Sequence, residues 1–477
     1  MPKTTSQIIQ GGMGTGVSNW VLARCVSQTG QLGVVSGTVL DTIFARRLQI
    51  GDPDGHMRRA LKHFPNQDIA KDVLKDYFIE GGKDASTAYK RIPMYSVQPP
   101  QRLYNLTVCA NFCEVWLAKE GHNGLVGINF LEKLQMPNLA AFYGAMLAGV
   151  NYVLMGAGIP IQVPGILDKL ALHEPVTLRL QVDESHPGDE FTMHFDPKSV
   201  IPNPVGQLER PDFLAIVASH TLALMLATKA SGVVNGFIVE GPTAGGHNAP
   251  PRGQVQLNDK GEPIYGERDE VDMAKMRELG RPFWMAGSFA TPDKLRQAIQ
   301  DGAEGVQIGT AFALSRESGL TPELRQQSLE KMRDGSLETF TDPKASPSGF
   351  PFKVALLEES LSEQDTYADR PRTCDLGYLR KMYRKPDGTV GYRCASEPLR
   401  QYEAKGGKTE DTEGRKCLCN ALVANIGLAQ VQKTGYVEQA LVTLGDDFTL
   451  VKTLTEKHGL DYSATDVVSL LLDSLRG

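Results

Sequence analysis

Eight short apolar segments separated by helical patterns or polar insertions constrain this chain more than any other feature. Strands that alternate with helices are typical of parallel sheets, because each helix returns the chain to the same edge of the sheet. Eight such units predict an α/β fold, the (β/α)8 or TIM barrel. The strand-like segments are residues 8–10, 33–35, 126–130, 152–155, 213–217, 236–239, 282–286 and 305–308.

Long polar stretches interrupt this alternation and are interpreted as insertions. They lie at about residues 37–122, 176–210 and 248–272, and the second reads as an accessory hairpin. A stretch rich in Pro, Ser and Asp then marks a domain boundary. We predict a barrel domain over residues 1–340, followed by a C-terminal region over residues 341–477 that carries a four-cysteine cluster.

Composition limits the classes of partner. The 477-residue chain has a formal net charge of −6 and lacks the basic excess expected of proteins that bind nucleic acid or anionic membranes. It shows no signal-peptide core, and no stretch approaches the roughly 18 apolar residues of a membrane span, so a cytoplasmic location is expected. These features favour small-molecule chemistry. An apolar helical pattern over residues 467–475 suits either packing within the chain or a homo-oligomer.

Glycine-containing loops follow the seventh and eighth predicted strands. Gly287 and Ser288 come directly after the seventh strand, and Gly309 and Thr310 after the eighth. Barrels commonly bind phosphate between these two loops, since glycines let backbone amides approach an anion closely. One such loop alone is equally well explained as a tight turn. The two loops follow consecutive strands, and this favours a phosphate site over two unrelated turns.

Polar residues at two other strand ends are expected at the same rim. Asn129 ends the third strand, where its amide would bond the polar edge of a planar ligand or cap a turn. His247 follows the sixth strand behind Gly245 and Gly246, which permit close backbone approach to a ligand. Because histidine titrates near neutral pH, His247 is the predicted catalytic residue. A hydrogen-bonded rim histidine without a chemical role is the alternative.

Four of the seven cysteines, Cys374, Cys394, Cys417 and Cys419, lie in the C-terminal region. An odd number of unevenly placed cysteines does not suit a secreted disulfide framework. Four thiolates would hold zinc or an iron–sulfur cluster. Either group would stabilise the fold of a region that has few long apolar segments. Free or buried thiols are the alternative, because the spacing is not the compact C-x-x-C pattern.

Short motifs occur in barrel order between about residues 7 and 315. They are Ile9–Gly14, Gly127–Asn129, Gly156–Pro160, Ala244–His247, Ala286–Ser288 and Gln307–Phe312. As an ordered set, these motifs resemble the nitronate monooxygenase (2-nitropropane dioxygenase) family and its relatives, the FMN-dependent type II enoyl-acyl-carrier-protein reductases. Two departures stand out. Glu240 occupies a position where many nitronate monooxygenases carry glutamine, and Thr243 occupies one that is usually acidic.

The resemblance implies an FMN cofactor with His247 as the active-site histidine. The expected function is therefore that of an FMN-dependent oxidoreductase that oxidises nitronates or nitroalkanes with O2, with His247 as base. An NAD(P)H-dependent enoyl-thioester reductase is the nearest alternative, and a non-catalytic flavin-binding component of a biosynthetic complex is an alternative of another class. The expected flavin-binding residues are Gly12, Met13, Asn129, Glu240, Gly245, Gly246, Gly287, Ser288, Gln307, Ile308, Gly309 and Thr310.

Overall fold

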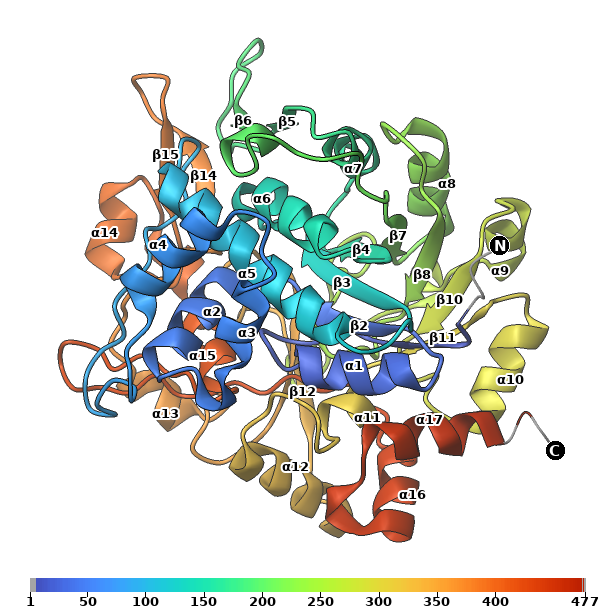
Figure 1. Cartoon of the computed structure of the whole chain (residues 1–477). Helices are drawn as coiled ribbons and strands as arrows, with labels where there is room; N and C mark the ends of the chain where they lie inside the picture. Colours follow the sequence, from blue (N-terminus) through green and yellow to red (C-terminus); the bar gives the residue numbers. More distant parts are fainter. Residues whose placement is uncertain (1–5, 474, 476–477) are drawn as a thin grey trace.

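A ring of eight parallel strands forms the centre of the computed structural model, which describes residues 6–473 and 475 (Figure 1). Every pairing along the eight-stranded sheet is parallel. The predicted TIM barrel and its eight strands are confirmed. In chain order the strands are β1 (Ile8–Gln10), β2 (Gly33–Ser36), β3 (Val126–Leu131), β4 (Tyr152–Gly156), β7 (Asp212–Val217), β8 (Gly236–Glu240), β10 (Phe283–Ala286) and β11 (Gly305–Ile308).

The ring closes at a seam between β1 and β2. The backbone N–H of Gln10 donates to the carbonyl of Leu32 at 2.9 Å, and the N–H of Leu32 donates to the carbonyl of Ile8 at 3.1 Å. The buried side chain of Gln10 then bonds both backbone groups of Val34, donating through Nε2 at 3.0 Å and accepting through Oε1 at 2.9 Å. The side-chain amide of Gln10 therefore takes the place of a backbone peptide group, because the backbone hydrogen bonds between β1 and β2 are few.

Apolar side chains from the strands fill the inside of the barrel. Ile9, Leu154, Leu214 and Ile238 belong to one buried cluster there. Trp284 joins the same cluster, and its indole N–H donates to the carbonyl of Ser6 at 2.8 Å. The barrel is thus a packed core, as expected for eight strands.

Helices surround the strands, and two of them come from unexpected parts of the chain. Helix α5 arises from the long insertion and packs between α1 and α6. Helix α17 arises from the C-terminal region and packs against α1 and α10, so it occupies the place after β11 (Figure 1). The outer helices are α1 (Trp20–Gln28), α5 (Gln101–Lys119), α6 (Gln135–Leu147), α7 (Val163–Ala171), α8 (His220–Lys229), α9 (Met273–Glu278), α10 (Pro292–Gln300) and α17 (Ala464–Asp473).

The predicted accessory hairpin is confirmed as the antiparallel pair β5 (Val176–Arg179) and β6 (Thr192–Phe195). The first insertion also contains α2 (Leu40–Gln49), α3 (His56–Leu61) and α4 (Gln67–Tyr77). Short 3-10 turns lie at Pro53–Gly55, Pro197–Ser199, Glu267–Asp269, Thr409–Thr412 and Gly459–Asp461.

The chain beyond β11 continues across the barrel rather than away from it. Strand β13 pairs with β12 on one side and with the two-residue strand β9 (Gly246–His247) on the other, so this part of the chain is hydrogen-bonded to the loop after β8. Its elements are α11 (Thr310–Ala313), α12 (Pro322–Asp334), β12 (Thr339–Asp342), β13 (Phe352–Ala355), α13 (Gln364–Asp369), β14 (Lys381–Arg384), β15 (Val390–Arg393), α14 (Leu399–Ala404), α15 (Leu418–Ala424) and α16 (Thr449–His458).

The predicted metal centre is not supported. Cys374, Cys394, Cys417 and Cys419 do line one small cavity, but all four are free thiols. Within residues 6–473 and 475, no group of three or more His, Cys, Asp or Glu side chains is arranged to hold a metal ion. Burial raises the pKa of each of these thiols, that of Cys394 to about 12, in the metal-free chain.

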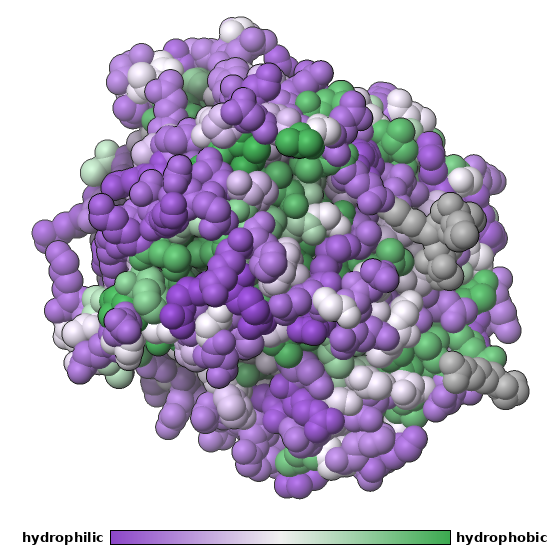
Figure 2. Space-filling model, in the orientation of Figure 1, coloured by the Kyte–Doolittle hydropathy of each residue, from purple (hydrophilic) through white to green (hydrophobic). Residues whose placement is uncertain are grey.

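A buried ion pair occurs in this region instead. Arg370 donates to both carboxylate oxygens of Glu438, each at 2.8 Å, and both side chains are shielded from solvent. Hydrophilic side chains predominate on the outer face shown in Figure 2. No helix among the described residues is long and apolar enough to cross a membrane.

We predict that Gln10→Leu lowers the free energy of unfolding by about 2 to 4 kcal/mol, because it leaves the buried N–H and carbonyl of Val34 without partners. Gln326→Leu, at an exposed position on α12, is the matched control and should change stability by no more than about 0.5 kcal/mol. Chemical denaturation curves measure both. Equal effects of the two substitutions would show that the Gln10 amide does not hold the seam.

Candidate active site

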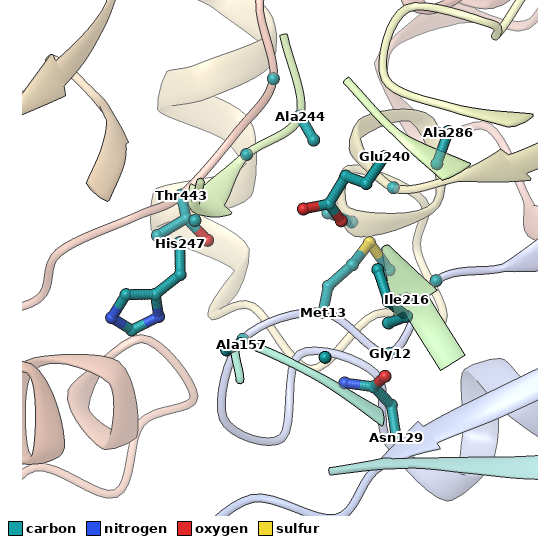
Figure 3. A pocket seen from close by; sticks show the side chains of 18 of the residues that line it. Gly12, Met13, Asn129, Ala157, Ile216, Glu240, Ala244, His247, Ala286 and Thr443 are labelled. Carbon is teal, nitrogen blue, oxygen red and sulfur yellow. The ribbon is translucent and has the colours of Figure 1, made fainter. Parts of the chain in front are cut away.

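One pocket opens at the carboxyl ends of the barrel strands. All the residues predicted to bind the cofactor line it, together with His247. Figure 3 shows Glu240, Met13, Asn129 and Ile216 on one side and His247 and Thr443 on the other. The rim of a TIM barrel is the usual location of its active site.

The loops after β10 and β11 form one end of the pocket. Gly287 and Ser288 both adopt positive φ, at 87° and 57°, so the chain turns sharply where it lines the pocket. The hydroxyl of Thr310 accepts a hydrogen bond from the backbone N–H of Gly445 at 2.9 Å. A segment from the C-terminal region therefore meets the two predicted loops at this end of the pocket, where the glycines and hydroxyls of the loops after β10 and β11 suit an anion.

A buried polar atom without a partner among the described residues also lies in the pocket. The side-chain oxygen of Gln307 is buried and accepts no hydrogen bond from the described residues. Gly12 approaches Asn129 so closely that a Cβ there would lie 2.3 Å from the Cβ of Asn129. The close approach leaves the Asn129 amide facing the pocket (Figure 3). Unpaired buried polar atoms are rare in proteins and mark a place for a polar ligand edge.

Glu240 ends β8 and also points into this part of the pocket (Figure 3). Burial raises the pKa of its carboxyl group to about 7, and no cationic side chain offsets this effect. Near neutral pH the group is therefore poised between its acid and carboxylate forms, so it can donate or accept a hydrogen bond.

His247 is held in place by β9. Its register partner in β13 is Phe352, whose ring lies 4.6 Å from the imidazole. Nε2 of His247 is 2.8 Å from the hydroxyl of Ser346, which leaves Nδ1 without a bond to the described protein. Burial, with a smaller contribution from the charge of Lys133, holds the pKa of His247 well below its ordinary value. The imidazole is therefore neutral near pH 7, and one of its ring nitrogens can act as an acceptor.

The C-terminal region supplies a wall of the pocket that the sequence did not reveal. Leucines from three separate places lie in this wall, and nothing in their local sequence distinguishes them from core residues. The unpredicted lining residues from this region are Phe352, Tyr378, Leu379, Leu418, Cys419, Leu422, Thr443, Leu444, Gly445 and Asp447.

A barrel with glycine loops suited to an anion and a half-buried neutral histidine at one rim pocket has the layout of a cofactor-dependent enzyme. The family model described as nitronate monooxygenase matches residues 162–344. That range holds β7 to β11, and therefore His247 and both glycine loops. The match confirms the resemblance over this part of the chain and identifies an oxidoreductase enzyme. No curated protein matches the sequence.

Solved structures show distant likenesses. FabK from Thermotoga maritima is 15% identical with a TM-score of 0.48, covering 99% of this chain and 93% of that one. Nitroalkane oxidase from Streptomyces ansochromogenes is 14% identical with a TM-score of 0.45, covering 99% and 96%. The enoyl reductase domain of MlnA from the macrolactin biosynthesis cluster of Bacillus amyloliquefaciens is 11% identical with a TM-score of 0.46, covering 99% and 96%. None of these likenesses bears on the chemistry.

Glu240 should make stability depend on pH in the cofactor-free protein. Its folded pKa of about 7 lies above the ordinary value of 4.5, so the folded state gains from this group at low pH and loses that advantage as the pH rises toward 7. Glu240→Gln cannot titrate. The variant should therefore gain up to about 3 kcal/mol relative to the original chain between pH 4.5 and pH 8.

Denaturation curves at several pH values measure this difference, with Glu278→Gln, at an exposed position on α9, as the matched control. A stability difference between Glu240→Gln and the original chain that stays constant with pH would contradict the raised pKa.

Proposed function

We propose that this chain is an FMN-dependent oxidoreductase that oxidises nitroalkanes or nitronates with O2, using His247 as the base. The observation that carries the proposal is the place of His247, which lies on β9 in the same pocket as the glycine loops after β10 and β11 and the unpartnered side-chain oxygen of Gln307. The match of residues 162–344 to the nitronate monooxygenase model supports the same assignment. It also argues against a purely structural flavin-binding component.

The pocket residues fit FMN. Gly287, Ser288, Gly309 and Thr310 would hold the phosphate, since the glycines and hydroxyls of these two loops suit an anion. The unpartnered side-chain oxygen of Gln307 and the side chains of Asn129 and Glu240 would bond the polar edge of the flavin ring, with Gly12, Met13, Gly245 and Gly246 near its surface. When bound, FMN would accept electrons from the substrate and pass them to O2.

His247 would remove a proton from the carbon that bears the nitro group. Nδ1 is the nitrogen free to receive this proton, because Nε2 is engaged with Ser346. The electron pair of the broken C–H bond would remain on the substrate and spread onto the nitro group. Phe352 packs against the imidazole at 4.6 Å and limits its rotation, so the base is preorganised for the transfer. A nitronate, already deprotonated, would not need this step.

An NAD(P)H-dependent enoyl-thioester reductase is the second candidate, and one observation favours it. Leu379, Leu418 and Leu422 from the C-terminal region line the pocket, as do Leu131 and Leu134, which gives it an apolar lining suited to an acyl chain. In this reaction His247 would orient or polarise the thioester carbonyl, and NAD(P)H would be the source of the hydride.

Gly12→Ala should weaken FMN binding by at least about tenfold, because the added methyl group would displace Asn129 from the flavin edge. Gly266→Ala is the matched control, since a Cβ at that position meets no atom within 4 Å. Titration of the cofactor-free protein with FMN, followed by flavin fluorescence, measures both. Unchanged FMN affinity in Gly12→Ala would place the flavin elsewhere, and a protein that takes up no FMN would refute the proposal.

His247→Ala should slow anaerobic flavin bleaching by a neutral nitroalkane by about 10² to 10⁴-fold, the usual contribution of a positioned base. Bleaching by the preformed nitronate should change much less. His186→Ala, in the exposed hairpin, is the matched control. Stopped-flow absorbance measures these rates. Rapid bleaching by NAD(P)H, with none by nitroalkane or nitronate, would replace the oxidase with the enoyl reductase.

A further inference from the structure

A line of hydrogen bonds leads from His247 away from the pocket. Nε2 of His247 is 2.8 Å from Oγ of Ser346, which is 2.7 Å from Oγ of Ser348. Nζ of Lys133 donates to Oγ of Ser348 at 3.3 Å. We call these four atoms and their bonds the proton path. Each serine hydroxyl can donate one hydrogen bond while accepting another, so the path is continuous for a proton.

Three separate segments build the proton path, and each is fixed by other contacts. His247 lies on β9, both serines lie between β12 and β13, and Lys133 lies between β3 and α6. The serine segment is held by Arg415, whose guanidinium donates to the carbonyl of Ser346 at 2.7 Å. Ser346 itself is fully shielded from solvent. Such rigid support preserves the geometry that proton transfer needs.

The lysine at the far end lies in an apolar environment. Its ammonium lies 4.4 Å from the ring centre of Phe350, and burial lowers the pKa of Lys133 well below its ordinary value. The adjacent Glu132 opposes this shift, and burial raises the pKa of Glu132. Lys133 therefore becomes a neutral amine at pH values at which an exposed lysine stays charged.

We propose that Ser346, Ser348 and Lys133 are positioning residues that accept, along the proton path, the proton that His247 removes from the substrate. The inference rests on the proposed role of His247 as base. The C–H bond breaks, its electron pair stays on the substrate, and its proton bonds to Nδ1. Nε2 then gives its proton to Ser346, Ser346 gives one to Ser348, and Ser348 gives one to Nζ of Lys133. Each serine ends unchanged, the imidazole stays neutral, and Lys133 becomes the ammonium.

The first test is the pH dependence of anaerobic flavin bleaching by a nitroalkane in the FMN-loaded enzyme. The rate should rise as Lys133 loses its proton. Lys133→Met and Ser348→Ala should lose this rise and be roughly ten- to a hundredfold slower at the top of the profile, as when the hydrogen-bonded partner of an active-site histidine is removed. Ser348→Thr keeps the hydroxyl and should follow the original enzyme.

Two outcomes overturn the proposal. The variants could keep the shape of the original pH profile, which would make Lys133 and Ser348 merely structural. Alternatively, Ser348→Thr could lose the rise as Ser348→Ala does, which would show that the hydroxyl is not what matters. FMN content and circular dichroism of each variant confirm folding, and Ser348→Ala tests the path even where Lys133→Met does not fold.

A second test needs no turnover. Nitrogen NMR of enzyme labelled in its histidines reports the pKa and tautomer of His247, whose signal is identified by its loss in His247→Gln. Lys133→Met should raise the pKa of His247, because the positive neighbour is removed, and Ser346→Ala should change its tautomer. If nitroalkanes do not bleach the flavin, the proposed function fails and the path has no substrate proton to carry, which overturns it. If they do, an altered tautomer in Ser346→Ala supports the path, and an unaltered titration and tautomer overturn it.

Discussion

The side-chain amide of Gln10 holds the barrel shut at the seam between β1 and β2, and the pocket depends on that closure. Gly11 follows directly and donates its N–H to the carbonyl of Ile308 at 2.8 Å, which ties the first loop to the eighth strand. Gly12 and Met13 then enter the pocket beside Asn129. The Gln10 side chain therefore strengthens the closure of the ring at the point where the surface on which a flavin would lie begins.

The pocket is lined both by barrel loops and by residues of the C-terminal region. Strand β13 pairs with β9 and so fixes His247, while Lys353 on the same strand donates to the carbonyl of Pro242 at 3.0 Å. Gly445 bonds Thr310 at the other loop of the pocket. His247 and the loop after β11 thus share support from the C-terminal region. Leucines of the pocket wall also belong to this region.

The sequence was informative where the determining forces are local. The eight strands and the glycine loops were predicted because a buried parallel strand needs apolar residues and a tight turn at the rim needs glycine. The predicted flavin residues meet in one pocket for the same reason, since parallel strands bring their carboxyl ends to a single rim.

What the sequence could not indicate depends on tertiary contacts. Ser346 and Lys133 are far apart in the chain, and no local sequence pattern predicts that both are hydrogen-bonded to Ser348. Four nearby cysteines suggested a metal centre, but sequence spacing does not determine how the thiols are arranged in space, and in the described residues no group of three or more potential ligands could hold a metal ion.

Helix α17 packs against α1, so segments from opposite ends of the sequence meet in the wall of the barrel. Contacts between such distant segments form late, because a long loop must close before they stabilise anything. During synthesis, β1 and α1 leave the ribosome long before α17 exists, and their apolar faces stay uncovered for that interval. The hydrogen bond between Gly445 and Thr310 at the pocket also joins segments far apart in the chain. The pocket is therefore complete only after the C-terminal region has folded onto the barrel.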